Sequence, residues 1–248
     1  MAYETRERVH ARWVRVTHWI LSVSILTLAF SGFVILMAHP RLYWGDAGND
    51  LTPALIELPI SRNFRHGGWA ERTSISESNS GIISASRTFD TFNQNGWGRS
   101  LHFLAAWGLV LAGSVYLLAG ILGGHFQAHI WPKLRELSPP LVWRDLADHL
   151  SLRVRPAPGG PNYGLLQKCA YSAVVFLAAP LAVLTGLTMS PRVSAAFPIL
   201  LRAFGGAQSA RTLHFAAFFV LLLFAIVHVV MVIRSGFRRQ IRAMTFGE

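Results

Sequence analysis

The segment RTLHFAAFFVLLLFAIVHVVMVIR, from Arg211 to Arg234, decides the fold of this chain. Between its terminal arginines lie 22 residues without a single Asp, Glu, Lys or Arg. A helix needs roughly 20 predominantly apolar residues to cross a bilayer. Only helices and closed barrels satisfy the backbone in lipid, and this run does not alternate between polar and apolar residues. The segment therefore predicts a membrane-spanning helix.

Three more charge-free runs are long enough to span a membrane: 16–40, 100–132 and 169–191. We expect helices near residues 13–37, 100–123, 164–189 and 211–235, with Pro180 disturbing the third because proline interrupts helical hydrogen bonding. The long polar segment 38–99 predicts an extramembrane cap between the first two helices. The predicted fold is an all-α integral membrane four-helix bundle, a single domain over residues 1–248.

The composition supports a membrane protein. Of the 248 residues, 52% are hydrophobic and only 14% are charged, whereas a soluble domain carries about 25% charged residues. The net charge of +11 comes from basic residues that flank the apolar runs, which indicates membrane topology rather than nucleic-acid binding. The lone cysteine, Cys169, excludes an internal disulfide, iron–sulfur ligation and covalent c-type haem.

The Lys and Arg distribution predicts the orientation. The side that holds both termini and the second loop carries 14 of these residues, against nine on the other side. The positive-inside rule then places both termini of this multi-pass chain in the cytoplasm.

Four of the ten histidines lie within the expected helices: His18, His102, His214 and His228. Ionisable residues inside a membrane are costly and mark functional sites. The alternating direction of the helices sorts them by depth into His18 with His228 and His102 with His214. On the fourth helix, 14 residues separate the two histidines, which corresponds to roughly 40° of azimuth and a rise of roughly 21 Å. Because histidine is a standard axial ligand of haem iron, we expect two bis-histidine haem b groups.

Glycines and arginines near these histidines are candidates to bind the two haems. Glycine leaves room for a porphyrin, and we expect this of Gly32, Gly113 and Gly120, although small residues also serve ordinary helix packing. An arginine precedes three of the histidines by three residues, where haem propionates would need cations. These residues are Arg15, Arg99 and Arg211, which could alternatively only mark helix ends.

His125 and His129 have the i, i+4 spacing of a metal-binding pair. No carboxylate or third ligand stands close in sequence, which favours a solvated pair instead.

Several motifs resemble the membrane cytochrome b subunits of formate dehydrogenases, nickel-iron hydrogenases and thiosulfate reductases over nearly the whole chain. They are Arg15-Val-Thr-His18-Trp19, Ser31-Gly32-Phe33, His102, the His214/His228 pair and Met231-Val-Ile-Arg-Ser-Gly236. The segment Arg41-Leu-Tyr-Trp-Gly45 is most similar to the thiosulfate-reductase-type branch. Four helices favour the formate-dehydrogenase-like arrangement over the five-helix hydrogenase type, although the long outer segment departs from it.

The resemblance implies a di-haem conduit between the quinone pool and an extracytoplasmic oxidoreductase, of molybdenum or nickel-iron type, often joined through an iron–sulfur subunit. The chain would be the electron-transfer subunit in the cytoplasmic membrane, without catalytic residues of its own. A quinone is expected beside the inner haem, bordered by Arg15, His18, His228 and Arg234.

Two alternatives remain open from the sequence. One is a stand-alone cytochrome b561-like enzyme that oxidises superoxide or reduces ferric iron with quinone. The other is a haem-free channel or anchor. The direction of electron flow is not decided by the sequence.

Overall fold

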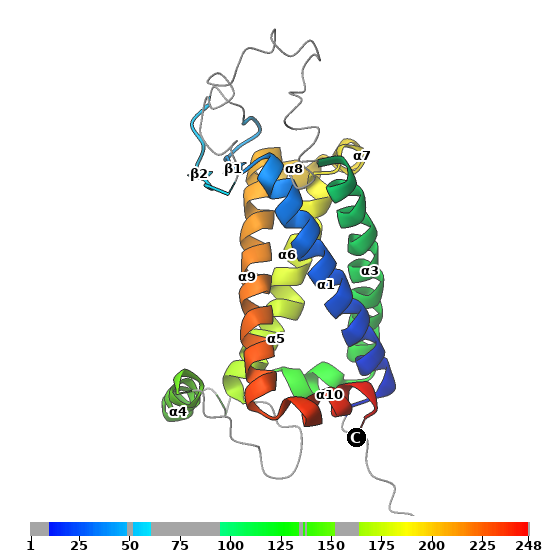
Figure 1. Cartoon of the computed structure of the whole chain (residues 1–248), viewed down its shortest axis with the longest axis vertical. Helices are drawn as coiled ribbons and strands as arrows, with labels where there is room; N and C mark the ends of the chain where they lie inside the picture. Colours follow the sequence, from blue (N-terminus) through cyan, green and yellow to red (C-terminus); the bar gives the residue numbers. More distant parts are fainter. Residues whose placement is uncertain are drawn as a thin grey trace, which may run out of the picture. The chain divides into compact units, whose positions relative to one another are not determined.

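The computed structural model describes residues 10–48, 52–60, 95–133, 136, 138–151 and 164–247. Within these ranges, four helical stretches are long and apolar enough to cross a membrane (Figure 1). They are α1 (Arg12–Ala38), α3 (Asn95–Leu122), the stretch Leu165–Thr188 and α9 (Ala207–Arg234). The prediction of an all-α, multi-pass membrane protein is confirmed, and the expected helix ends differ from the observed ones by a few residues.

The third span changes its hydrogen-bond register halfway. It consists of α5 (Leu165–Ala173), the π-helical turn η5 (Val174–Ala178) and α6 (Ala179–Thr188). Pro180 is the second residue of α6. A proline has no N–H and crowds the carbonyl four residues earlier. A π-helical turn next to it lets the Ala179 N–H donate to Val174 O, five residues back. The expected disturbance at Pro180 thus takes the form of a π turn.

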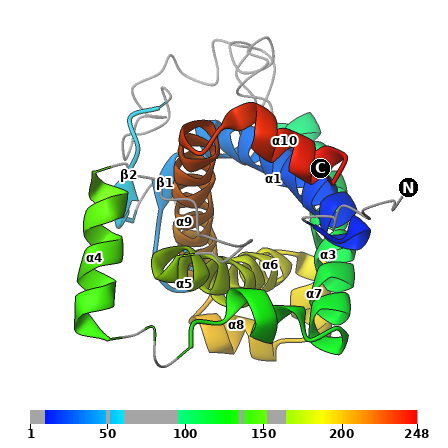
Figure 2. The ribbon, with the colours of Figure 1, turned by 90° about the horizontal axis from the view of Figure 1, so that it is seen from below.

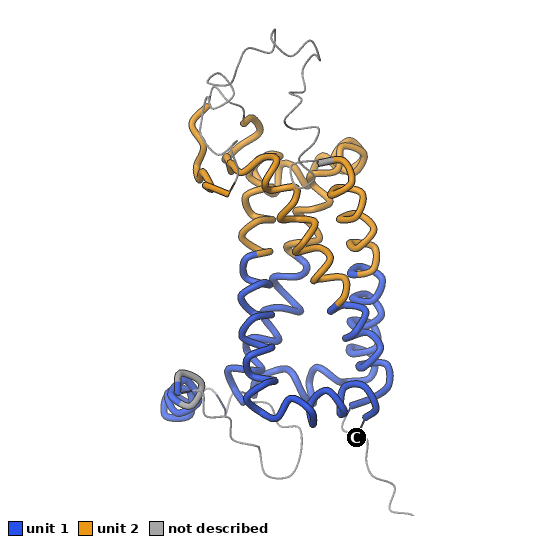
Figure 3. The backbone as a smooth tube through the Cα atoms, viewed as in Figure 1, with its two compact units in different colours: residues 1–22, 109–180, 219–248 blue, residues 23–108, 181–218 orange. Residues whose placement is uncertain are grey.

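The chain forms two compact units, shown in different colours in Figure 3. Unit 1 contains 1–22, 109–180 and 219–248, and unit 2 contains 23–108 and 181–218. Each long helix contributes residues to both units, so the single domain stays a prediction. Each unit holds one of the two predicted histidine pairs.

In unit 2, the chain that follows α1 is bound to the start of α9. The short strands β1 (Arg41–Leu42) and β2 (Ile56–Glu57) pair antiparallel. The hydroxyl of Thr212 donates to Tyr43 O at 2.6 Å, and Gly45 N donates to Ser209 Oγ at 2.7 Å. The loop between α6 and α9 holds α7 (Pro191–Ala196) and α8 (Ile199–Phe204). Of these elements, β1 and β2 lie in the segment 38–99 where the cap is expected, and residues 61–94 of that segment lie outside the described ranges, so the cap stays a prediction.

Unit 1 contains three short elements that the sequence did not predict: η3 (Phe126–Ile130), α4 (Pro139–Leu150) and α10 (Phe237–Thr245). Figure 2 shows α10 beside the start of α1. The guanidinium of Arg15 donates to Thr245 O at 2.9 Å, and Trp19 Nε1 donates to Met244 O at 3.2 Å. The carboxylate of Asp145 on α4 accepts a 2.6 Å bond from Leu166 N at the start of α5.

Large apolar side chains are exposed along the spans. Leu122 at the end of α3 is 85% exposed, and on α9 Leu223, Ile226 and Val230 are exposed as well. Contiguous apolar surface of this kind is rare on soluble monomers and marks a surface that meets an apolar environment. These side chains are therefore those that face lipid in a bilayer.

One ion pair in unit 1 predicts a pH dependence. Lys168 Nζ lies 2.7 Å from Glu136 Oε1 and 2.9 Å from Oε2. The hydrogen bond from Lys168 lowers the pKa of Glu136 below its ordinary value. A carboxylate whose pKa is lower in the folded state stabilises the fold above its unfolded pKa and loses that contribution as the pH falls through its folded pKa.

We therefore expect Glu136→Gln to lower the thermal midpoint at pH 7, by an amount equivalent to roughly 1 kcal/mol or less because the carboxylate is partly exposed. The difference from the parent chain should disappear at acidic pH, below the folded pKa of Glu136. Thermal unfolding in detergent at the two pH values measures it. A difference that is equal at both pH values would contradict the assignment.

Candidate functional site

The His102 ring on α3 and the His214 ring on α9 face each other in unit 2. Their ring centroids lie 6.1 Å apart with an interplanar angle of 65°, and both side chains are half-buried. The helices α3 and α9 thus bring together two histidines that are far apart in the sequence, and these are the two that the alternating helix directions placed at one depth.

The His102 ring is oriented by a serine on α1. His102 Nδ1 lies 3.0 Å from Ser31 Oγ. The Ser31 hydroxyl itself donates to Thr27 O at 2.7 Å, four residues earlier in the same helix. A hydroxyl has one hydrogen, so Ser31 Oγ accepts from His102, and the imidazole proton resides on Nδ1.

The His214 ring has the same arrangement on other helices. His214 Nδ1 lies 3.1 Å from Thr185 Oγ1 and 2.9 Å from Ala182 O, both on α6. The Thr185 hydroxyl donates to Leu181 O at 2.6 Å. Since a carbonyl only accepts hydrogen bonds, the proton again resides on Nδ1. In both histidines, Nε2 is left with the lone pair that a metal needs.

A glycine lies against each of these imidazoles. A Cβ on Gly32 would lie 3.5 Å from His102 Cε1, and a Cβ on Gly186 would lie 3.3 Å from His214 Cε1. Both glycines follow the hydroxyl residue directly in the sequence. Each half of the site therefore consists of a hydroxyl–glycine pair on one helix and a histidine on another.

The second pair lies in unit 1. The His18 ring on α1 and the His228 ring on α9 have centroids 6.3 Å apart and an interplanar angle of 55°. The Phe224 ring stacks on His228 at 5.7 Å, and the Tyr171 ring lies 6.4 Å from it. Two buried nitrogens, His18 Nδ1 and Arg15 Nε, have no hydrogen-bond partner within the described ranges. Unsatisfied buried polar atoms are uncommon and suit a site that a bound group completes.

Both pairs have the spacing that a bis-histidine iron requires. With iron–nitrogen bonds of roughly 2.0 Å and ring nitrogens roughly 1.1 Å from the ring centre, two imidazoles that held one iron would have ring centroids up to roughly 6.2 Å apart. The observed values are 6.1 and 6.3 Å. Neutral imidazoles with the proton on Nδ1 are the form that binds haem iron, so the residues present fit a haem in each unit.

The comparison with protein families agrees with this geometry. The family model of prokaryotic cytochrome b561 matches residues 9–247. The chain belongs to the prokaryotic cytochrome b561 family. This cytochrome b561 is therefore a multi-pass membrane protein of the haem b class, whose general role is electron transfer.

A relative supports the assignment. The chain is 30% identical over 226 residues to the Azospira oryzae protein named "Putative protein-methionine-sulfoxide reductase subunit YedZ1", covering 90% of this chain and 89% of that protein. No solved structure matches the chain. The predicted membrane cytochrome b family is confirmed, whereas the specific branch of formate dehydrogenases, hydrogenases and thiosulfate reductases stays a prediction.

The four arginines predicted near haem have different environments in this cytochrome b561. Arg15 is buried and donates to Thr245 O, and its Nε has no hydrogen-bond partner among the described residues. Arg211 donates to His39 O at 2.6 Å, at the end of α1. Arg99 and Arg234 are exposed. Among these four, Arg15 combines burial with an unsatisfied donor. The propionate-binding role of Arg15, Arg99 and Arg211 and the quinone-bordering role of Arg15 and Arg234 stay predictions.

The three predicted glycines also differ. Gly32 contacts the His102 ring, as described above. Gly113 has only Leu21 Cδ2 nearby, 3.9 Å from a Cβ placed there. A Cβ on Gly120 would overlap the Phe126 ring, so this glycine packs closely against η3. The contact of Gly120 matches the small-residue packing that the sequence left open as an alternative, and its haem-facing role stays a prediction.

A histidine cluster occupies the end of unit 1. The His125 and His129 rings stack at 4.8 Å, and the Trp13 ring lies 5.3 Å from His125. Burial, and then the neighbouring His129, lower the pKa of His125. No group of three or more potential metal ligands occurs among the described residues. His125 is therefore a packed histidine rather than a fully solvated one.

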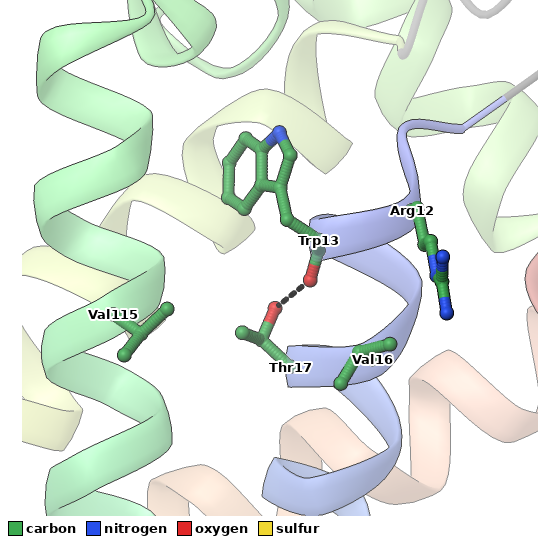
Figure 4. Close-up of a pocket in the computed structure, with 5 residues that line it drawn as sticks. All are labelled: Arg12, Trp13, Val16, Thr17 and Val115. Carbon is green, nitrogen blue, oxygen red and sulfur yellow. Dashed lines mark hydrogen bonds between the residues drawn. The ribbon is translucent and has the colours of Figure 1, made fainter.

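Trp13 also lines a shallow apolar depression on unit 1 (Figure 4). Arg12, Val16, Thr17 and Val115 complete its lining, and Thr17 Oγ1 donates to Trp13 O at 2.8 Å. The hydroxyl of Thr17 is thereby turned toward its own helix. The depression offers apolar contacts to a bound molecule from α1 and α3.

Sequence reasoning missed Thr185 and Gly186. The signal was present, because Arg99-Ser-Leu-His-Phe103 and Arg211-Thr-Leu-His-Phe215 nearly repeat. Ser31 and Gly32 contact His102 of the first repeat. A search of the third span for a second hydroxyl–glycine pair would have found Thr185-Gly186.

Proposed function

We propose that this cytochrome b561 conducts electrons across the membrane through two b-type haems. His102 and His214 would hold one, and His18 and His228 the other. The observation that carries the proposal is the pair of facing imidazoles in each unit, at 6.1 and 6.3 Å. When bound, each haem supplies one-electron reduction and oxidation at iron.

The protein's contribution is placement. In unit 2, hydrogen bonds hold the proton of each histidine on Nδ1 and aim Nε2 away from the supporting helix. In unit 1, the stacked Phe224 ring fixes the plane of His228. His214 and His228 both lie on α9, separated by 14 residues, which corresponds to a rise of roughly 21 Å along a helix. The helix α9 would thus supply one ligand to each site.

The partners follow from the same proposal. The quinone pool would exchange electrons beside His18 and His228, where Arg15 and Arg234 would border the quinone. An extracytoplasmic catalytic or iron–sulfur subunit, of molybdenum or nickel-iron type, would exchange electrons with the other haem. The printed name of the Azospira oryzae relative, a reductase subunit, supports such a catalytic partner. The chain would lie in the cytoplasmic membrane with both termini inside, and it would belong to the thiosulfate-reductase-type branch.

Haem stoichiometry tests the proposal. The full chain purified in detergent should show sharp reduced b-type bands and two haems per chain. A folded but colourless preparation, or one haem per chain at saturation with added haem, would refute it. Rapid turnover of superoxide or ferric iron with quinone by the chain alone would instead favour the stand-alone enzyme.

A further inference from the structure

We infer that Ser31 and Thr185 are positioning residues that set the redox potential of the haem at His102 and His214. They act through the Nδ1 hydrogen bonds of the two axial imidazoles. The inference rests on the proposed function, because it assumes that these imidazoles bind iron.

The first argument concerns the direction of the hydrogen bonds. Each hydroxyl donates its only hydrogen to a carbonyl four residues earlier in its own helix, at 2.7 Å for Ser31 and 2.6 Å for Thr185. Each is therefore locked as an acceptor toward the imidazole. For His214, Ala182 O at 2.9 Å is a second acceptor of the Nδ1 hydrogen bond and requires the same tautomer.

The second argument is the duplication. The same order of carbonyl, hydroxyl and imidazole occurs twice, once between α1 and α3 and once between α6 and α9. A glycine follows each hydroxyl residue and leaves room for the ring. The arrangement thus occurs in both copies of the near repeat that carries His102 and His214, with serine in one copy and threonine in the other.

The third argument is the contrast with other hydroxyl residues. Thr188, on the same helix as Thr185, donates to Leu184 O at 2.8 Å, and no hydrogen bond joins it to an imidazole among the described residues. In unit 1, the buried His18 Nδ1 has no hydrogen-bond partner within the described residues. The acceptor pattern is thus specific to the imidazoles of unit 2.

An acceptor on Nδ1–H makes the imidazole a stronger electron donor to the metal and favours the ferric state. Removing the hydroxyl should therefore raise the midpoint potential of this haem, and in Thr185→Val the remaining acceptor of His214 Nδ1, Ala182 O at 2.9 Å, limits the rise. We expect each loss of a hydroxyl to change the ratio of ferric to ferrous haem by at most roughly tenfold, which for one electron is about 59 mV.

The test is a potentiometric titration of purified holoprotein, followed by its optical bands and by electron paramagnetic resonance. Thr185→Val and Ser31→Ala should each raise the potential of one haem and change its ferric resonance, while the other haem keeps both. Thr185→Ser retains the hydroxyl and should restore the parent potential. The matched controls are Thr188→Val and Ser24→Ala, since Thr188 (1% exposed) is as buried as Thr185 (0% exposed) and Ser24 is buried on α1.

Three results would overturn the inference: unchanged potentials in Thr185→Val and Ser31→Ala with both haems bound, equal shifts of both haems, or an equal shift in Thr185→Ser. If Thr185→Val loses one haem outright, retention of that haem by Thr185→Ser and Thr188→Val still supports the role of the hydroxyl. The haem content of the parent chain separates the two proposals, because a parent chain without two haems refutes the proposed function first.

Discussion

His214→Ala is expected to leave this cytochrome b561 with one haem instead of two. The variant would lose one of the two imidazoles that we propose to hold this haem, and its neighbours Thr185 and Ala182 offer no side-chain nitrogen in its place. His102→Ala should remove the same haem, because the two rings face each other at 6.1 Å. Haem content per chain, with the reduced-minus-oxidised spectrum, measures the loss.

The double variant His102→Ala/His214→Ala should match either single variant, since both act on one haem. His18→Ala should remove the other haem and leave the spectrum of the first. His129→Ala is the matched control, because this histidine is exposed and belongs to neither pair. If His102→Ala and His214→Ala removed spectroscopically different haems, the pairing would be wrong.

In His228→Ala, we expect quinol to leave the remaining haem oxidised during the time in which it fully reduces the parent protein. The proposed quinone position borders His18 and His228, so the electron would lose its first acceptor. With the haem of His18 and His228 absent, quinol at that position would have no haem beside it to reduce. Stopped-flow spectra of the protein in liposomes, after addition of a short-chain quinol, measure the rate.

Dithionite provides the control for His228→Ala. It should reduce the remaining haem in the variant, which shows that the haem is intact and that only the path from quinol is lost. Reduction by quinol at the parent rate would instead place quinol oxidation beside the haem of His102 and His214.

Much of the fold was predictable because a bilayer imposes one dominant constraint. A charge-free run such as the one between Arg211 and Arg234 has few alternatives to a spanning helix. The histidine pairs followed from the same constraint, since helices that alternate in direction order their residues by depth. Those two rules needed no knowledge of side-chain contacts.

The remaining features depend on contacts that a linear pattern does not reveal. The role of Thr185 arises from a neighbouring helix, and its hydroxyl resembles that of Thr188 in sequence terms. The helix α10 contains Arg238, Arg239 and Arg242, so it lacked the apolar run by which the spans were found. It forms beside α1, where Arg15 binds its last turn.

The internal repeat has tyrosines where an exact repeat would have two further histidines. Tyr116 follows His102 by the same 14 residues that separate His228 from His214. His18 precedes Ser31 by 13 residues, and the residue at the same spacing before Thr185 is Ser172. The π turn adds one residue to this helix, so Tyr171 takes the position equivalent to His18. The Tyr171 ring lies 6.4 Å from the His228 ring. Two phenols thus occupy the positions where exact symmetry would put two more imidazoles. In unit 2, both copies of the repeat have a hydroxyl residue and a histidine. In unit 1, one copy has two histidines and the other has two tyrosines, whose phenol groups can release or accept a proton.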